Sequence, residues 1–196
     1  MADAAALLAE IAAEFPGFRV VYKRNSPLSR AIDGALRALT LGRQREYLTR
    51  YHTVIGRTLY LPDAWASTSE IARVIVLRHE RVHLHQFRRY GLLGMAALYL
   101  LPLFPVGLAW GRARLEWEAY RETLAATAEL RGLAAAQSPA LREEIVDRFV
   151  SGAYGWMWPF RRTVERWYDD VIRELEARTD PSSRRPPRRH RDSEEA

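Results

Sequence analysis

The chain has no cysteine among its 196 residues, which excludes disulfide bonds and every metal site built on thiolates. Any bound metal must therefore be held by His, Asp and Glu side chains. The first fifteen residues lack the basic leader of a secretory signal and predict an amphipathic helix instead. Because both absences fit a reducing compartment, we expect a cytoplasmic protein.

The excess of basic over acidic residues is modest in every part of the chain. The net charge is +6, but residues 178–196 hold six arginines and four acids among prolines and serines. A segment of this composition cannot bury a core, so residues 179–196 are predicted to be a disordered basic tail. The remainder carries a net charge near +4 and no motif that reads nucleic acid, so we do not expect specific nucleic-acid binding.

Residues 1–178 predict a single domain of the α+β class, mostly helical with a small sheet. Apolar residues make up 48% of the chain and charged residues 28%, as in ordinary globular proteins. β-rich residues concentrate in 18–23 and in 53–61, where Gly56 divides a hairpin or bent strand. The patterns and their stop signals predict further helices over 26–42, 112–131, 138–151 and 162–178.

The best-marked predicted helix lies between residues 67 and 91. Ser67 and Glu70 match an S-x-x-E capping box, and Gly91 is expected just past the last helical residue. Residues at four-residue spacing lie on one face of a helix. On this helix they are Ile71, Ile75, His79, His83 and Phe87.

Residues 79–83 read His-Glu-Arg-Val-His and match the pattern H-E-x-x-H. Two histidines four residues apart on a helix project side by side, so His79 and His83 can bind one zinc ion. Glu80 would lean toward the open side of that ion, where it can accept a proton from water. The pattern therefore predicts a zinc site with Glu80 as general base.

A zinc site of this kind needs a third protein ligand, and the helix predicted over 112–131 offers Glu116 and Glu118. Glu116-x-x-Ala119 resembles the third-ligand motif of the gluzincin metallopeptidases, Glu-x-x-Ala-Asp, with Tyr120 in the place of Asp. Gln86 extends the first motif to H-E-x-x-H-x-x-Q, a form similar to that of several small bacterial gluzincin-like domains.

The resemblance implies a zincin-like fold, zinc as the cofactor, and a peptide or protein substrate. It favours Glu116 over Glu118 as the ligand, because Ala119 fits the small position of the motif. Glu118, with Glu122 as its partner, remains the rival. The Asp of the family hydrogen-bonds a histidine ligand, so Tyr120 would have to make a different contact.

Two further residues are candidates for supporting roles at this site. His85 follows His83 by two residues and should point to another side of the helix, as a supporting or surface residue. Tyr154 is a candidate donor to a tetrahedral intermediate, or a packed aromatic residue.

Residues 92–110 contain no charge over nineteen positions. A single membrane crossing would separate His83 from Glu116 by roughly 30 Å, which excludes a shared ion. Pro102 and Pro105 predict a turn instead. This apolar hairpin would either dip into one leaflet of an anionic membrane, flanked by arginines, or cap the site as a buried hairpin.

Two functional alternatives use the same metal motif. One is the hydrolysis of another amide or an ester by a zinc enzyme. The other is a non-catalytic binding module, held together by the metal and apposed to a membrane. An open coordination position favours catalysis, whereas four protein ligands favour the structural role.

Overall fold

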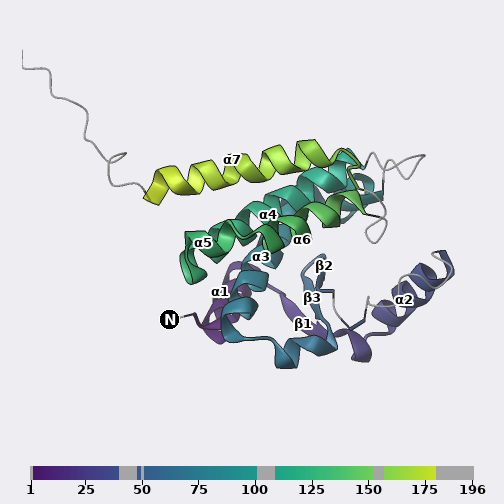
Figure 1. Cartoon of the computed structure of the whole chain (residues 1–196). Coiled ribbons are helices and arrows are strands. Elements are labelled where there is room, and N and C mark those ends of the chain that lie inside the picture. Colours follow the sequence, from purple (N-terminus) through teal and green to yellow (C-terminus); the bar gives the residue numbers. More distant parts are fainter. Residues whose placement is uncertain (1, 40–47, 50, 101–108, 152–156, 180–196) are drawn as a thin grey trace, which may run out of the picture.

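The chain folds into helices around a small three-stranded sheet, as a computed structural model of the full sequence shows (Figure 1). The structure describes residues 2–39, 48–49, 51–100, 109–151 and 157–179. The N-terminal half contains α1 (Ala4–Glu14), β1 (Arg19–Tyr22), the 3-10 turn η1 (Lys23–Asn25), α2 (Pro27–Leu39), β2 (Thr53–Ile55), β3 (Thr58–Leu61) and η2 (Asp63–Ser67). The C-terminal half contains α3 (Glu70–Leu100), α4 (Trp110–Arg131), α5 (Leu133–Ala136), α6 (Pro139–Val150) and α7 (Arg161–Thr179).

The prediction of a mostly helical α+β fold is confirmed. β2 and β3 form the expected antiparallel hairpin, and Gly56 has the positive φ of 62° that its turn requires. β1 adds a parallel strand on the other side of β3, so the sheet order is β1-β3-β2. Among the described residues, no helix has both the length and the apolarity to cross a bilayer.

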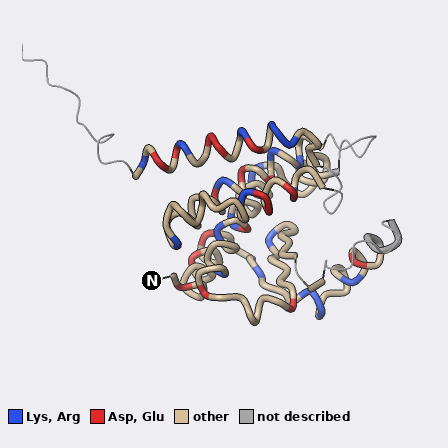
Figure 2. The backbone as a smooth tube through the Cα atoms, viewed as in Figure 1, with Lys and Arg blue, Asp and Glu red and all other residues tan. Residues whose placement is uncertain are grey.

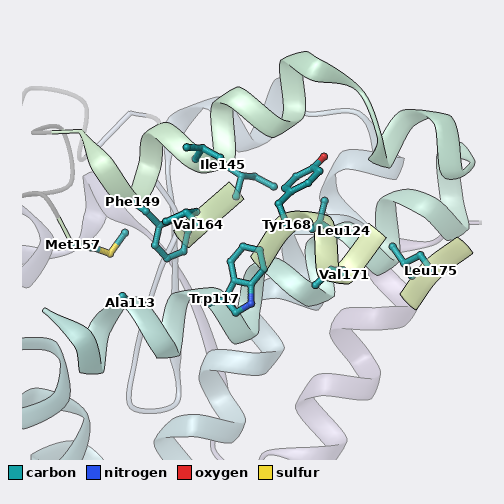
Figure 3. Close-up of a cluster of buried hydrophobic side chains, with 11 residues drawn as sticks. Ala113, Trp117, Leu124, Ile145, Phe149, Met157, Val164, Tyr168, Val171 and Leu175 are labelled. Carbon is teal, nitrogen blue, oxygen red and sulfur yellow. The ribbon is translucent and has the colours of Figure 1, made fainter. Parts of the chain in front are cut away.

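Helix α3 lies between two apolar clusters (Figure 1). On one side α1, the sheet and the first half of α3 share a core that includes Ile11, Leu59 and Leu77. On the other side α4, α6 and α7 enclose a second core around Trp117, Phe149 and Tyr168 (Figure 3). α3 and α4 pack antiparallel between these clusters, so residues from both helices meet in the interior.

Helix α3 begins later than predicted, and it bends at Gly91, where its end was predicted. Its N-terminal cap is Ser69, whose hydroxyl accepts from the Ala72 amide, because η2 occupies residues 63–67 and takes Ser67 into its own turn. The predicted capping box at Ser67 and Glu70 is therefore wrong. Gly91 has the expected left-handed φ of 67°, but a helical arm continues beyond it to Leu100.

Several predictions fall outside the described residues. They are the helix stop at Gly42, the turn between Pro102 and Pro105, the role of Tyr154, and the tail from residue 180 onward. The cap of α6 is as predicted, since the Ser138 hydroxyl accepts from the Leu141 amide and Pro139 begins the helix.

Candidate metal centre

The middle of α3 carries His79, Glu80 and His83 into the space between the two apolar clusters. Glu80 and His83 are buried, and the rings of His79 and His83 lie 5.0 Å apart between centroids. The four-residue spacing places both imidazoles on the side of α3 that faces α4. These side chains are therefore enclosed by protein and do not lie on a solvated helix face.

Helix α4 brings Glu116 to the two imidazoles. Its Oε2 lies 3.9 Å from His79 Nε2 and 3.9 Å from His83 Nε2. One ligand atom from each of the three residues lies within 4.8 Å of the others. Ligand atoms around a tetrahedral zinc are ~3.3–3.5 Å apart, so the two distances to Glu116 exceed those of a zinc site by about half an ångström. The donor set of two imidazoles and one carboxylate fits zinc.

Gln86 fixes the orientation of His83. Its side-chain oxygen lies 2.9 Å from His83 Nδ1, while its amide nitrogen donates to the Leu115 carbonyl and to Glu118, both at 3.0 Å. Because the amide nitrogen must donate, the oxygen is left to accept the Nδ1 proton of His83. The lone pair of His83 therefore lies on Nε2, which faces Glu116.

Thr123 fixes the orientation of His79. Its hydroxyl donates to the Ala119 carbonyl at 3.3 Å, so its oxygen is available to accept the Nδ1 proton of His79 at 2.9 Å. Tyr120 stands where the gluzincin motif has Asp, and its ring meets the His79 ring at 5.0 Å between centroids. The contact to His79 Nδ1 is thus made by Thr123, three residues after Tyr120.

The charges at the centre act on one another because the groups are buried. Burial, with the help of Glu116 and against the opposing effects of His83 and Lys23, raises the pKa of Glu80 to about 7. Burial and the neighbouring His83 hold the pKa of His79 well below its ordinary value. Although burial alone lowers it, Glu116 and Glu80 raise the pKa of His83. Glu80 Oε2 has no hydrogen-bond partner among the described residues.

Lys23 is the only lysine of the chain, and its side chain is fully buried next to this centre. Its Nζ donates to Thr53 Oγ1 at 2.9 Å, and its charge acts on Glu80 and Asp33. Burial lowers the pKa of Lys23 to about 7. Burial, Lys23 and Arg148 together lower the pKa of His52 to about 4, so this histidine is neutral at physiological pH.

The structure separates the other candidates from the three potential ligands. Glu118 accepts from Gln86, and Glu122 pairs with Arg78 at 2.5 Å. His85 points toward α1, where its Nε2 lies 3.2 Å from Glu14. Glu116 is thus the carboxylate that α4 directs to the histidine pair, and Glu118 instead supports Gln86.

The sequence analysis did not predict a role for Lys23, Thr123 or Tyr99. The hydroxyl of Tyr99 donates a hydrogen bond to Glu116. A signal for Thr123 existed, because it follows Ala119 by four residues and Glu116 by seven and so shares their helix face. Lys23 and Tyr99 reach the centre through tertiary packing, and no local spacing marks them.

Comparison of the chain with known protein families, with curated proteins and with solved structures gives no match. The chemistry of the described side chains is therefore the basis for the function proposed below.

Proposed function

We propose that the chain is a zinc-dependent peptidase in which His79, His83 and Glu116 hold the ion and Glu80 is the general base. One observation carries this proposal. The Nε2 atoms of both histidines face the same oxygen of Glu116, each at 3.9 Å, while each Nδ1 is engaged elsewhere. Two imidazoles with their lone pairs turned toward one carboxylate form the ligand set of a catalytic zinc site.

Glu80 is suited to proton transfer beside this set. When bound, zinc supplies a Lewis acid that makes water acidic near neutral pH and polarises a carbonyl. Glu80 would take a proton from the attacking water and deliver it to the leaving nitrogen. Burial raises the pKa of this carboxyl, which makes its carboxylate a better proton acceptor than an exposed glutamate.

A groove beside the centre supports a chain-like substrate over a small amide. It has a volume of about 480 Å³, within the usual range for ligand sites, and lies between α3, α4 and α6. Ile75 and Thr123 line the groove, and Thr123 also bonds His79. Leu141 and Glu144 of α6 line it as well. A peptide crossing the centre has room there for residues on one side of the scissile bond.

Two observations favour catalysis over a purely structural metal. Among the described residues, three side chains make up the potential ligand set, which leaves a fourth position for water. The buried Glu80 Oε2 has no hydrogen-bond partner among the residues that the structure describes, although an unpaired buried carboxylate oxygen is costly. A water molecule or a substrate amide would satisfy it.

We further propose that the bend at Gly91 contacts an anionic membrane surface. Leu92 and Leu93 are 61% and 85% exposed, which is unusual for adjacent leucines. Arg88 and Arg89, both exposed, precede them on the same helix. Exposed apolar side chains beside arginines combine the two attractions that peripheral membrane binding uses.

The decisive experiment combines metal analysis with peptide cleavage. We expect the purified protein to hold one zinc ion per chain and the Glu116→Ala variant to lose it, whereas Glu118→Ala should retain most of it. Glu80→Gln should keep the zinc yet cleave an unstructured peptide pool at least 100-fold more slowly, as expected when a general base is lost. Cleavage is followed by mass spectrometry.

Glu174→Gln serves as the matched control, because this carboxylate is exposed on α7 and pairs with Arg121, away from the centre. It should cleave at the wild-type rate. Zinc retention with undiminished cleavage in Glu80→Gln would refute the assigned base. A protein that binds no zinc would refute the proposed function as a whole.

A further inference from the structure

The helical arm Leu92–Leu100, which follows the bend at Gly91, packs closely on the start of α4. The positive φ of 67° at Gly91 turns the arm out of the line of α3, a backbone conformation that glycine adopts without steric cost. Met95 is buried, so one side of the arm faces protein. A Cβ placed on Gly111 would lie 2.7 Å from the Leu98 carbonyl oxygen and 3.2 Å from Leu98 Cα. The two backbones therefore approach as closely as a glycine allows.

This packing brings Tyr99 to Glu116. The Tyr99 hydroxyl donates a hydrogen bond to Oε1 of Glu116, while the other oxygen, Oε2, faces both histidines. The two oxygens of one carboxylate thus have different partners. Arg112, one turn before Glu116 on α4, adds a positive charge that acts on both residues. The arm, which the sequence marked only as apolar, therefore supplies one polar group to the centre.

We propose that Tyr99 is a positioning residue for Glu116 and that the arm makes the metal site complete. The inference rests on the proposed zinc site. By occupying Oε1, the phenol restricts Glu116 to a single ligand atom, Oε2, and holds that atom opposite the two imidazoles. A hydrogen bond to a ligating carboxylate typically changes metal affinity 10–100-fold when it is lost. Movement of the arm would therefore change metal affinity although the arm itself supplies no ligand.

The test uses two variants that act on this contact from different sides. Tyr99→Phe removes only the hydroxyl, and Gly111→Ala pushes the arm away from α4 without changing the side chains of Tyr99 and Glu116. We expect both to bind zinc 10–100-fold more weakly in competition with a chromophoric chelator. We also expect a shared change in the visible spectrum of the cobalt-substituted protein, because Glu116 can then bind through both oxygens and raise the coordination number.

Tyr90→Phe is the matched control, since Tyr90 is exposed one residue before the bend. It should keep the wild-type affinity and spectrum. If the wild type binds zinc and cobalt but Tyr99→Phe matches it in affinity and spectrum, the inference is overturned and the zinc site stands. A wild type that binds neither ion overturns the proposed function as well. Should Gly111→Ala fail to fold, the comparison of Tyr99→Phe with Tyr90→Phe still decides.

Discussion

Individual side chains at the centre fix the chemistry of their neighbours through single hydrogen bonds. Thr123 and Gln86 each accept the Nδ1 proton of one histidine and so direct both Nε2 lone pairs toward Glu116. Neither residue would touch a metal ion. Their effect is to choose the tautomer and the ring orientation before any ligand arrives, which reduces the reorganisation that binding requires.

Replacing Thr123 with valine should weaken zinc binding about 10-fold, because His79 loses the acceptor for its Nδ1 proton. The measurement is a competition titration with a chelator of known zinc affinity. Thr127→Val is the matched control, since Thr127 lies one turn after Thr123 on α4 and its hydroxyl donates to the Thr123 carbonyl. Equal losses in the two variants would contradict a specific role for Thr123.

Lys23 predicts a pH dependence of stability. Its pKa falls from 10.5 in the unfolded chain to about 7 in the fold, mainly through burial. Between these values the unfolded chain binds more protons, so this residue destabilises the fold fully below pH 7 and progressively less as the pH approaches 10.5. Lys23→Met removes the titration. Its free energy of unfolding relative to wild type should fall with rising pH by up to about 1.4 kcal/mol per pH unit.

Urea denaturation of both proteins from pH 6.5 to 9.5 measures this difference. Because Lys23 is the only lysine, an NMR titration of isotope-labelled lysine side chains gives one signal and reports its pKa directly. A midpoint near 10.5 and a constant stability difference would show that the amine is hydrated in the folded protein.

At the scale of elements, the pair α3 and α4 was largely predictable and the ends of α3 were not. The spacing of His79 and His83, and the small residue Ala119, follow from local helix geometry, which a sequence displays directly. Ala119 is fully buried, as a close approach of the two helices requires. The choice between Glu116 and Glu118 depended on a resemblance to a family, because both carboxylates occupy the same helix two residues apart.

The ends of α3 depend on competition between neighbouring elements. Ser67 and Ser69 are equally good N-cap residues for α3. In the structure the Ser67 hydroxyl donates to the Ala64 carbonyl within η2, so Ser69 caps the helix. Glycine at position 91 favours a positive φ, which ends the first helical segment. Whether a second helical segment follows depends on the packing of residues 92–100 against α4. Such outcomes depend on residues distant in the sequence, as does the burial of Lys23.

At the scale of the whole molecule, acidic and basic residues alternate along the outer helix α7 (Figure 2). Arg142 of α6 pairs with Asp169 of α7, and Arg121 of α4 pairs with Glu174 of α7. Ion pairs therefore connect α7 to both α6 and α4. Exposed pairs of this kind add little stability each. The surface next to the bend at Gly91 differs, since it places arginines beside two exposed leucines.

The proposed membrane contact predicts salt-dependent association of the intact protein with vesicles. We expect it to sediment with vesicles of phosphatidylserine and phosphatidylcholine at low salt and to dissociate as salt screens the arginines. Replacing both Leu92 and Leu93 with serine should abolish most binding. Leu28→Ser, which changes an exposed leucine on α2, should not. Failure of the wild type to sediment at low salt would dismiss the membrane contact.

Helix α1 is fastened to α3 near both of its ends. Near its start, the Ala4 amide donates to the Glu70 carboxylate in the first turn of α3. At its end, Glu14 binds Arg81 at 2.6 Å and His85 at 3.2 Å, on the two turns that carry the histidine pair. An affinity tag fused ahead of residue 3 would therefore lie close to the first turn of α3. Purification tags are therefore better placed after α7. Deletion of the first fifteen residues should destabilise the part of α3 that carries His79 and His83.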